Sequence, residues 1–255
     1  MIKKHPRIAF RHFFQSPTEL AFAISLSCVG ASTAWAGGEQ TIERIVVTTS
    51  IAEQQAVANA ASEGTITKRQ IEARTVYRPG ELLESVPGLI ASQHSGEGKA
   101  NQFYLRGFNL DHGTDLRTTV DGMLVNQRSH AHGQGWTDVN FLIPELTNLL
   151  EYRKGPFFAA EGDFSSAGAV NVRYANTLAQ GIASVGLGQN GYARTFLAAS
   201  PQLGDGNLLY ALELFRNDGP FTVGDDFRKR NAVLRYSQGA QDNGFNLTLM
   251  AYEAS

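Results

Sequence analysis

The sequence predicts an exported chain in which a compact α+β domain, residues 65–176, precedes the first five antiparallel strands of a large transmembrane β-barrel, residues 177–255. Three observations predict this fold class. The first 36 residues have the pattern of an export signal, the middle of the chain has short mixed elements, and its end has long alternating strands separated by turns. The 26 glycines and 8 prolines in 255 residues also suit strands joined by tight turns.

Residues 1–36 are organised like a secretory signal peptide. A basic stretch that ends at Arg11 precedes the apolar run Leu20–Val29, and Ala34 and Ala36 supply the small residues that a signal peptidase requires. The apolar run is too short for a transmembrane helix. Cys28 is the single cysteine and is removed with this segment, so we expect neither a disulfide nor thiol chemistry in the mature chain.

The charge of the mature chain argues against a nucleic-acid partner. The signal holds four of the 22 Lys and Arg residues and one of the 24 Asp and Glu residues, which leaves 18 basic and 23 acidic side chains and a net charge of −5. Nucleic-acid-binding domains carry a basic patch instead. The mature chain also lacks an apolar stretch long enough for a spanning helix, so it can enter a membrane only as strands of a closed barrel.

Residues 37–64 are predicted to contain an extended segment and a flexible linker. Ile45, Val46, Val47 and Thr48 are β-branched, which stiffens the chain toward an extended form. Residues 51–64 show neither alternation nor turn residues, as expected of a linker. A β-branched segment without a local partner suits addition to the sheet edge of another protein. The alternative is that it forms the first strand of the following domain.

Local patterns predict the elements of the α+β domain. Thr67 and Gln70 form a capping box for a short helix that contains Ile71. Asp121-Gly122, between two apolar runs, is the strongest hairpin pattern in the chain. The remaining elements are expected to be a helix at residues 80–86 with Pro79 in its first turn, a strand at 103–105, a brief helix at 144–150, and strands at 151–154 and 169–174.

After residue 176 the pattern changes to longer alternating strands. They are expected at residues 181–188, 193–200, 208–215, 230–237 and 245–252. The last strand places Phe245 and Leu247 on one face and Asn246 and Thr248 on the other. A soluble β-sandwich shares this alternation, so the export signal decides in favour of a membrane barrel. Because bacterial barrels have at least about eight strands, we expect the chain to be part of a longer polypeptide.

Five motifs, taken in order, resemble those of the TonB-dependent receptors of Gram-negative outer membranes. The similarity covers nearly the whole mature chain, although Phe157-Phe158 stands where the family often has Tyr-Gly. The motifs are Ile45-Val46-Val47-Thr48 as the TonB box, Glu84-Ser85-Val86-Pro87-Gly88, Leu105-Arg106-Gly107-Phe108, Val120-Asp121-Gly122, and Tyr152-Arg153-Lys154-Gly155-Pro156 followed by Gly168-Ala169-Val170-Asn171-Val172.

The resemblance implies a transport function in the cell outer membrane. Residues 65–176 would be a plug domain in the lumen of a lipid-embedded barrel of about 22 strands, with the TonB box facing the periplasm. A small molecule or metal chelate would bind on the outer side of the plug, and TonB would then pair with the box and open the plug. Ferric siderophores are the commonest cargo of the family, and a metal ion such as zinc is a second candidate. The resemblance implies no catalytic residue and no cofactor.

Two groups of side chains are candidates for function. The resemblance implies that arginines beside the plug motifs, Arg106 and Arg153, hold the plug to carboxylates of the barrel wall. The second group falls in polar, glycine-rich segments on the ligand side of the plug, where imidazole and carboxylate groups could coordinate zinc or copper and an indole could stack on an organic ligand. This group consists of His94, His112, His130, His132, Asp111 and Trp136.

Two other functions stay open at this point. A passive outer-membrane channel would have no use for residues 45–48 or for a plug. A short periplasmic plug-like binding module without transport would need a native reading frame that ends near residue 255. An enzyme is not expected, because the sequence has neither a nucleophile elbow nor the helical histidine pattern of zinc hydrolases.

Overall fold

The computed structural model describes residues 57–240 and 243–255, and every structural statement below concerns these residues. The expected signal peptide and the expected TonB-binding residues Ile45–Thr48 lie outside them. The described residues belong to one compact unit. Among the described helices, none is long and apolar enough to cross a membrane.

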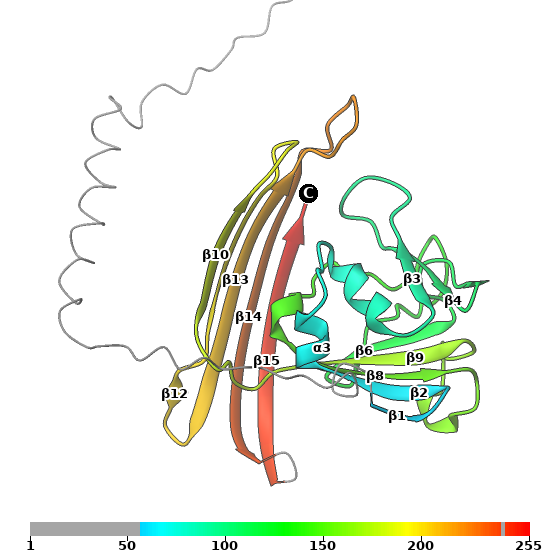
Figure 1. The fold of residues 1–255 in the computed structure, drawn as a ribbon, viewed down its shortest axis with the longest axis horizontal. Coiled ribbons are helices and arrows are strands. Elements are labelled where there is room, and N and C mark those ends of the chain that lie inside the picture. The colour runs from blue at the N-terminus through cyan, green and yellow to red at the C-terminus, as the bar shows by residue number, and fades with distance from the viewer. Residues whose placement is uncertain (1–56, 241–242) are drawn as a thin grey trace, which may run out of the picture. The chain divides into compact units, whose positions relative to one another are not determined.

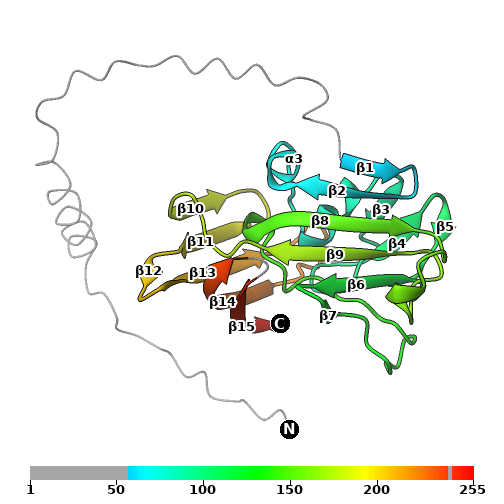
Figure 2. The ribbon, with the colours of Figure 1, turned by 90° about the horizontal axis from the view of Figure 1, so that it is seen from below.

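A six-stranded mixed sheet forms the centre of the α+β part (Figures 1 and 2). Four of its five strand pairs are antiparallel, and the parallel pair joins β6 to β9. In spatial order the strands are β1 (Val57–Ala60), β2 (Glu63–Thr67), β8 (Thr147–Lys154), β9 (Gly168–Tyr174), β6 (Leu116–Val120) and β7 (Met123–Leu124).

A smaller sheet and several short helices complete this part. The sheet joins β3 (Leu89–Ser92), β4 (Gln102–Leu105) and β5 (Phe108–Asn109). The helices are α3 (Lys68–Glu72) and the 3-10 helices η1 (Pro79–Ser85), η2 (Pro144–Leu146) and η3 (Ala159–Glu161).

The last part of the chain is an antiparallel sheet of long strands that lie side by side in Figure 1. The five predicted strands are all present, and β12, a short strand paired with β13, was not predicted. The strands are β10 (Ile182–Leu187), β11 (Ala193–Ala199), β12 (Gln202–Leu203), β13 (Gly206–Asn217), β14 (Phe227–Ala240) and β15 (Asn243–Ala254).

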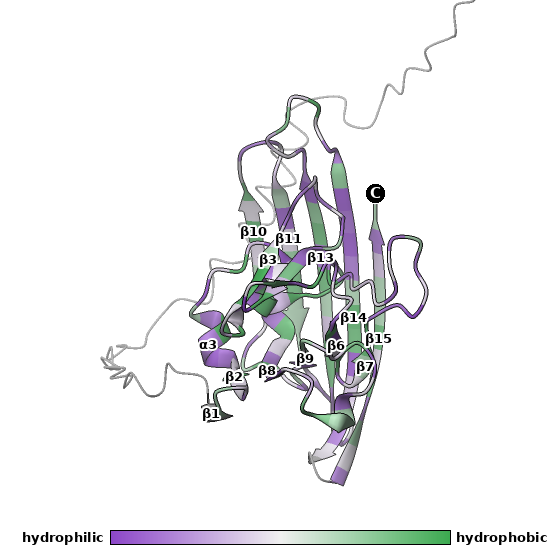
Figure 3. Ribbon diagram, turned by 90° about the vertical axis from the view of Figure 1, so that its right-hand side faces the viewer, coloured by the Kyte–Doolittle hydropathy of each residue, from purple (hydrophilic) through white to green (hydrophobic). Residues whose placement is uncertain are grey.

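The long sheet has an apolar outer face and an inner face that packs on the α+β part. On β15, Phe245 and Leu247 are exposed, as the alternation predicts. On the opposite face, Phe196 and Leu209 are buried and belong to the same apolar core as Leu146 of η2. The α+β part therefore covers the inner face. Hydrophilic and hydrophobic residues alternate along these strands (Figure 3).

Two local predictions are confirmed. The backbone N–H of Thr67 donates to Gln70 Oε1 at 2.8 Å, which closes the capping box at α3. Asp121 and Gly122 both have positive φ angles, of 50° and 83°, as the two central residues of a type I′ hairpin turn require.

Two other predictions are wrong. The sequence predicted a flexible linker up to residue 64, but from Val57 onward the chain forms β1 and the start of β2, which join the central sheet. The strands were missed because main-chain pairing does not require alternating polar and apolar side chains. The expected helix at residues 144–150 is limited to Pro144–Leu146. From Thr147 the chain pairs with β9, and from Leu149 also with β2, so strand formation extends four residues before the predicted start.

Gly168 in β9 offers a direct test of this central pairing. A Cβ at this position would lie 2.4 Å from the carbonyl oxygen of Arg153 in β8. We therefore expect Gly168→Ala to force the strands apart, at a cost of about 1–3 kcal/mol. Faster amide hydrogen exchange in β8 and β9 is the measurement. Gly181→Ala is the control, since its Cβ would lie 3.6 Å from Ala198 O. Equal exchange in the two variants would contradict this account.

Candidate functional site

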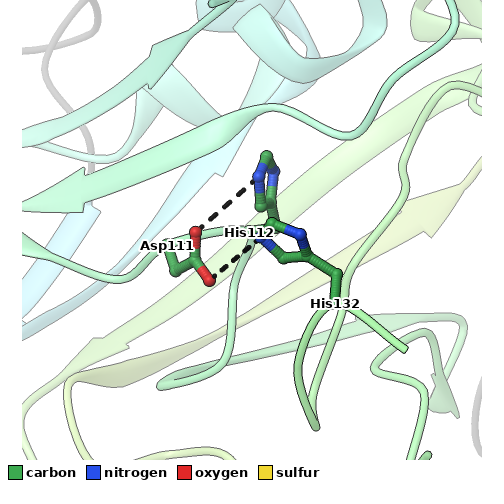
Figure 4. Close-up of side chains that lie close together, drawn as sticks. All are labelled: Asp111, His112 and His132. Atoms are coloured by element: carbon green, nitrogen blue, oxygen red, sulfur yellow. Dashed lines mark ion pairs between the residues drawn. The ribbon is translucent and has the colours of Figure 1, made fainter. Parts of the chain in front are cut away.

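The structure brings the six ligand candidates together from three loops. His94 lies in the loop after β3, Asp111 and His112 lie in the turn before β6, and the others lie in the loop after Asn126. Figure 4 shows three of these side chains converging. We call the six residues the histidine cluster: His94, Asp111, His112, His130, His132 and Trp136.

His112 is the buried member of the histidine cluster, with 3% of its surface exposed. Its Nδ1 lies 3.0 Å from the carbonyl oxygen of Ala100 and 3.2 Å from that of Asn101. Carbonyl oxygens only accept, so Nδ1 carries the proton and Nε2 keeps a free lone pair. Burial lowers the pKa of His112, although the Asp111 carboxylate opposes this shift. The neutral ring, which is the form that binds metal ions, is thereby favoured.

The donor atoms of the histidine cluster face one another at short distances. His112 Nε2 lies 3.3 Å from His94 Nε2 and 3.7 Å from Asp111 Oδ1. The other carboxylate oxygen, Asp111 Oδ2, lies 3.4 Å from His132 Nε2 (Figure 4). One ligand atom each from Asp111, His112 and His132 lies within 4.8 Å of the other two. These three side chains can therefore hold a metal ion.

Trp136 forms one wall of the histidine cluster. Its ring centroid lies 4.3 Å from that of His112, 4.4 Å from that of His130 and 4.9 Å from that of His132. His130 stacks nearly parallel on the indole, and its Nδ1 accepts a hydrogen bond from the backbone N–H of His132. Trp136 therefore packs against the imidazoles that carry the donor atoms.

The backbone at Asp111 explains how two consecutive residues reach one point. In an extended strand, neighbouring side chains point to opposite sides. Asp111 instead has a left-handed φ of 50°, and its N–H donates to Asn109 Oδ1 at 2.8 Å. Leu110, which is fully buried, anchors the turn. Positive φ in a residue other than glycine carries strain and occurs often at functional sites.

Asn126 joins the loops that carry the histidine cluster. Its buried Nδ2 donates to the carbonyl oxygens of Gly113, Leu116 and Gly135 at 2.9, 3.0 and 3.1 Å. Its Oδ1 accepts from the N–H of Thr118 at 2.7 Å. The turn with His112 and the loop with Trp136 are thereby tied to the start of β6. The sequence gives no indication of this role.

A second polar group joins the α+β part to the long sheet. Arg194 of β11 donates two hydrogen bonds to the carboxylate of Glu145 in η2, at 2.5 and 3.0 Å. Its Nε also donates to Glu213 of β13 at 2.7 Å. Lys229 Nζ lies 3.0 Å from the second oxygen of Glu213, and both of these side chains are buried. We call Glu145, Arg194, Glu213 and Lys229 the charge network.

A second arginine that joins the α+β part to the long sheet lies beside the predicted hairpin. Arg235 of β14 donates to Asp121 Oδ2 at 2.6 Å and to Asn176 Oδ1 at 2.9 Å. Asp121 also accepts from the N–H of Tyr174 at 3.2 Å. The aspartate of the Asp-Gly turn therefore fixes the hairpin and also anchors it to the inner face of the long sheet.

Residues 54–169 match the family model described as the TonB-dependent receptor plug domain. The chain therefore contains a TonB-dependent receptor plug domain. It is 26% identical over 232 residues to the vitamin B12 transporter BtuB of Vibrio vulnificus (strain CMCP6), a match that covers 88% of this chain and 37% of BtuB. The chain thus spans little more than a third of the length of that relative.

Solved structures with the same fold include two metal transporters. The copper transporter OprC matches with a TM-score of 0.59 and 18% identity, over 78% of this chain and 31% of OprC. The FrpB iron transporter from Neisseria meningitidis (F3-3 variant) matches with a TM-score of 0.57 and 17% identity, over 76% of this chain and 32% of FrpB. The fold is therefore a plug followed by antiparallel strands of the receptor-barrel type. The family is one of outer-membrane transporters and receptors, not enzymes.

Arg106 and Arg153, expected to hold the plug to the wall, make their described contacts within the plug. Arg106 Nη2 lies 3.4 Å from the carbonyl oxygen of Ala61. Arg153 Nη1 lies 2.6 Å from Glu161 Oε1, and its Nε lies 4.0 Å from Glu63 Oε2. In the described strands the ion pairs between plug and wall have the opposite arrangement, because Arg194 and Arg235 of the long sheet pair with the plug carboxylates Glu145 and Asp121. A role of Arg106 and Arg153 at the wall stays a prediction.

Replacing Asn126 by Ala tests how the site is held. The change would leave the buried Thr118 N–H without its partner, at a cost of roughly 1–3 kcal/mol, and would remove the hydrogen bonds that join three main-chain carbonyls through one side chain. We expect faster amide exchange in residues 110–118 and 127–136 of the intact receptor. The exposed Asn148→Ala variant on β8 is the matched control. Unchanged exchange in Asn126→Ala would show that the loops are held by other contacts.

Proposed function

We propose that this chain is part of an energy-coupled receptor that imports a scarce nutrient across the outer membrane, with the nutrient bound at the histidine cluster. The convergence of imidazole, carboxylate and indole groups on three plug loops supports this proposal. Plug-domain membership supplies the context of transport.

The position of the histidine cluster fits uptake from outside the cell. Outer-membrane barrels have long connections on the outside and short turns on the periplasmic side. The connection between β13 and β14 spans residues 218–226, longer than the turn before β15. It contacts the His94 loop through Asp225, whose Oδ2 accepts from the Glu97 N–H at 3.1 Å, and Asn217 at the end of β13 donates from Nδ2 to Glu97 Oε1, also at 3.1 Å. Figure 1 shows the two loops at the same end.

TonB is the proposed source of energy, with Ile45–Thr48 as its binding segment. A pull on this segment would reach the plug at β1, which lies at the edge of the central sheet and, among the described strands, pairs only with β2. The pull would next act on the pairing of β2 with β8. An edge strand is removed pair by pair, whereas an interior strand is held on both sides. We therefore propose that plug opening begins at β1 and β2.

Two ligand classes fit the proposed site. Ferric siderophores are the commonest cargo of the family, and the FyuA receptor from Yersinia pestis, named for ferric yersiniabactin uptake, shares the fold with a TM-score of 0.55, 19% identity, and coverage of 76% of this chain and 32% of FyuA. A metal ion such as zinc is the second class, and the imidazole donors of His112 and His132 favour it.

Growth and uptake experiments test the transport function. A strain that lacks the gene is compared with the wild type in iron-, zinc- and copper-limited media, with radiolabelled nutrient uptake measured in parallel. We expect slower growth in one medium only. Removal of residues 45–48 should abolish uptake and leave ligand binding intact, because these residues lie outside the histidine cluster. Uptake that persists without residues 45–48 would contradict energy coupling through TonB.

The charge network gives a further prediction about plug opening. Glu145→Gln weakens the two hydrogen bonds to Arg194, so we expect faster amide exchange at η2 and the start of β8. In an Arg194→Gln background, Glu145→Gln should add little further effect, because its partner is already lost, whereas Arg194→Gln by itself also removes a hydrogen bond to the buried Glu213. Arg228→Gln is the control, since its ion pair with Asp226 is exposed. Strictly additive effects would show that the two residues act independently.

A further inference from the structure

We infer that Asp111, His112 and His132 bind a bare divalent transition-metal ion such as Zn²⁺ or Cu²⁺, with His94 as a fourth ligand, and that this ion is the cargo. The inference deepens the proposed function and depends on it only for the statement that the ion is transported. It commits to a hydrated metal ion as the substrate instead of a ferric siderophore.

The spacing of the donor atoms supports a tetrahedral site. Zinc–nitrogen and zinc–oxygen bonds of about 2.0–2.2 Å place neighbouring ligand atoms of a tetrahedron ~3.3–3.6 Å apart. The distances between the side chains are 3.3 Å from His94 to His112, 3.4 Å from His132 to Asp111 and 3.7 Å from His112 to Asp111. The last two distances end on different oxygens of the Asp111 carboxylate, so two of the six edges are close to their required length whichever oxygen binds the ion. Because His132 and Asp111 are partly exposed, small rotations can close the others.

The surroundings of His112 resemble the outer shell of a metal site. Metal-binding histidines usually donate their second ring N–H to a carbonyl or carboxylate oxygen, which fixes the ring and the tautomer. His112 Nδ1 has this arrangement with the carbonyls of Ala100 and Asn101. Nε2 is left to face His94 Nε2 and Asp111 Oδ1. A buried ring with its lone pair directed at a second imidazole and a carboxylate is suited to a cation.

The packing of Trp136 disfavours the alternative of an organic ligand. Three imidazole rings already lie within 4.3–4.9 Å of the indole centroid. An aromatic or planar chelate that stacked on Trp136 would compete with His130, whose ring lies nearly parallel to the indole. Trp136 instead supports the rings of His112 and His132 and shields one side of the site. This places it close enough to report metal binding by fluorescence.

His132 and Arg128 form a pair of variants for the test. His132 supplies a proposed ligand atom and has a side chain that is 49% exposed, so His132→Ala should fold normally. Arg128 lies on the same loop, outside the histidine cluster, and forms an exposed ion pair with Asp163. Arg128→Ala therefore changes the surface of this loop and keeps the site. His112→Ala gives supporting evidence alone, because His112 is buried and its loss can affect folding as well as metal binding.

The experiment titrates intact receptor, purified in detergent and stripped of metal, with ZnCl₂ and with CuCl₂. Calorimetry gives affinity and stoichiometry, and Trp136→Phe identifies the share of fluorescence quenching by Cu²⁺ that comes from the site. We expect one ion per chain, at least about a 100-fold loss of affinity in His132→Ala, and less than about a 3-fold change in Arg128→Ala. Absence of binding, or equal affinities in the two variants, overturns the inference.

Uptake measurements separate this inference from the proposed function. Radiolabelled zinc or copper should enter cells with wild-type receptor and with Arg128→Ala, but not with His132→Ala or without residues 45–48. If the ion binds as expected and uptake of metal does not depend on the receptor, the ion is structural and the inference about cargo is overturned. Uptake of a ferric siderophore that requires residues 45–48 would in that case leave the proposed function standing. Absence of any receptor-dependent uptake contradicts both.

Discussion

The arrangement of plug and strands depends on the pairing of buried charges on the inner face of the long sheet. Glu213 is 2% exposed, and a carboxylate at such a site is tolerated only if cations and hydrogen bonds compensate for the lost water. Arg194 and Lys229 supply the cations, and Glu145 of the plug balances the second positive charge. The inner face of these strands is thus suited to contact with the plug, while the outer face is apolar. The plug in turn holds the histidine cluster at one end of the strands.

The histidine cluster combines a rigid part and an adjustable part. His112 is buried and oriented by two main-chain carbonyls, and Asn126 ties its turn to the loop that carries Trp136. Asp111 and His132 are partly exposed. A site that binds and then releases its cargo benefits from this division, because one fixed ligand selects the ion and exposed ligands can leave with little rearrangement. Glu97, on the same loop as His94, links this region to the connection between β13 and β14 through Asp225.

The features that could be predicted from the sequence are those fixed by nearby residues. The capping box at Thr67 and the turn at Asp121-Gly122 depend on two to four consecutive residues, and the alternation of β15 is visible within the strand itself. The start of β8 at Thr147 could not be predicted, because it depends on pairing with β9, more than twenty residues later. The same applies to β1, which was expected to be linker.

The histidine cluster could be predicted only in part from the sequence. Its members were identifiable because histidine, aspartate and tryptophan gather in glycine-rich segments, yet their convergence depends on the folding together of three loops. Asn126 could not be recognised, since its partners are main-chain carbonyls and leave no trace in the sequence. The pairing of Arg194 with Glu145 spans 49 positions and was likewise not visible in the sequence. The arginines that the sequence suggested for contact with the wall, Arg106 and Arg153, both belong to the plug.

X-ray absorption at the zinc edge is the most direct test of the site. The sample is the intact receptor with one equivalent of zinc. The account predicts a first shell of four nitrogen and oxygen atoms at about 2.0–2.1 Å, with the outer-shell scattering of imidazole rings, and it predicts that the ring scattering decreases in His132→Ala. A spectrum of zinc surrounded only by water oxygens, the same in wild type and variant, would contradict it.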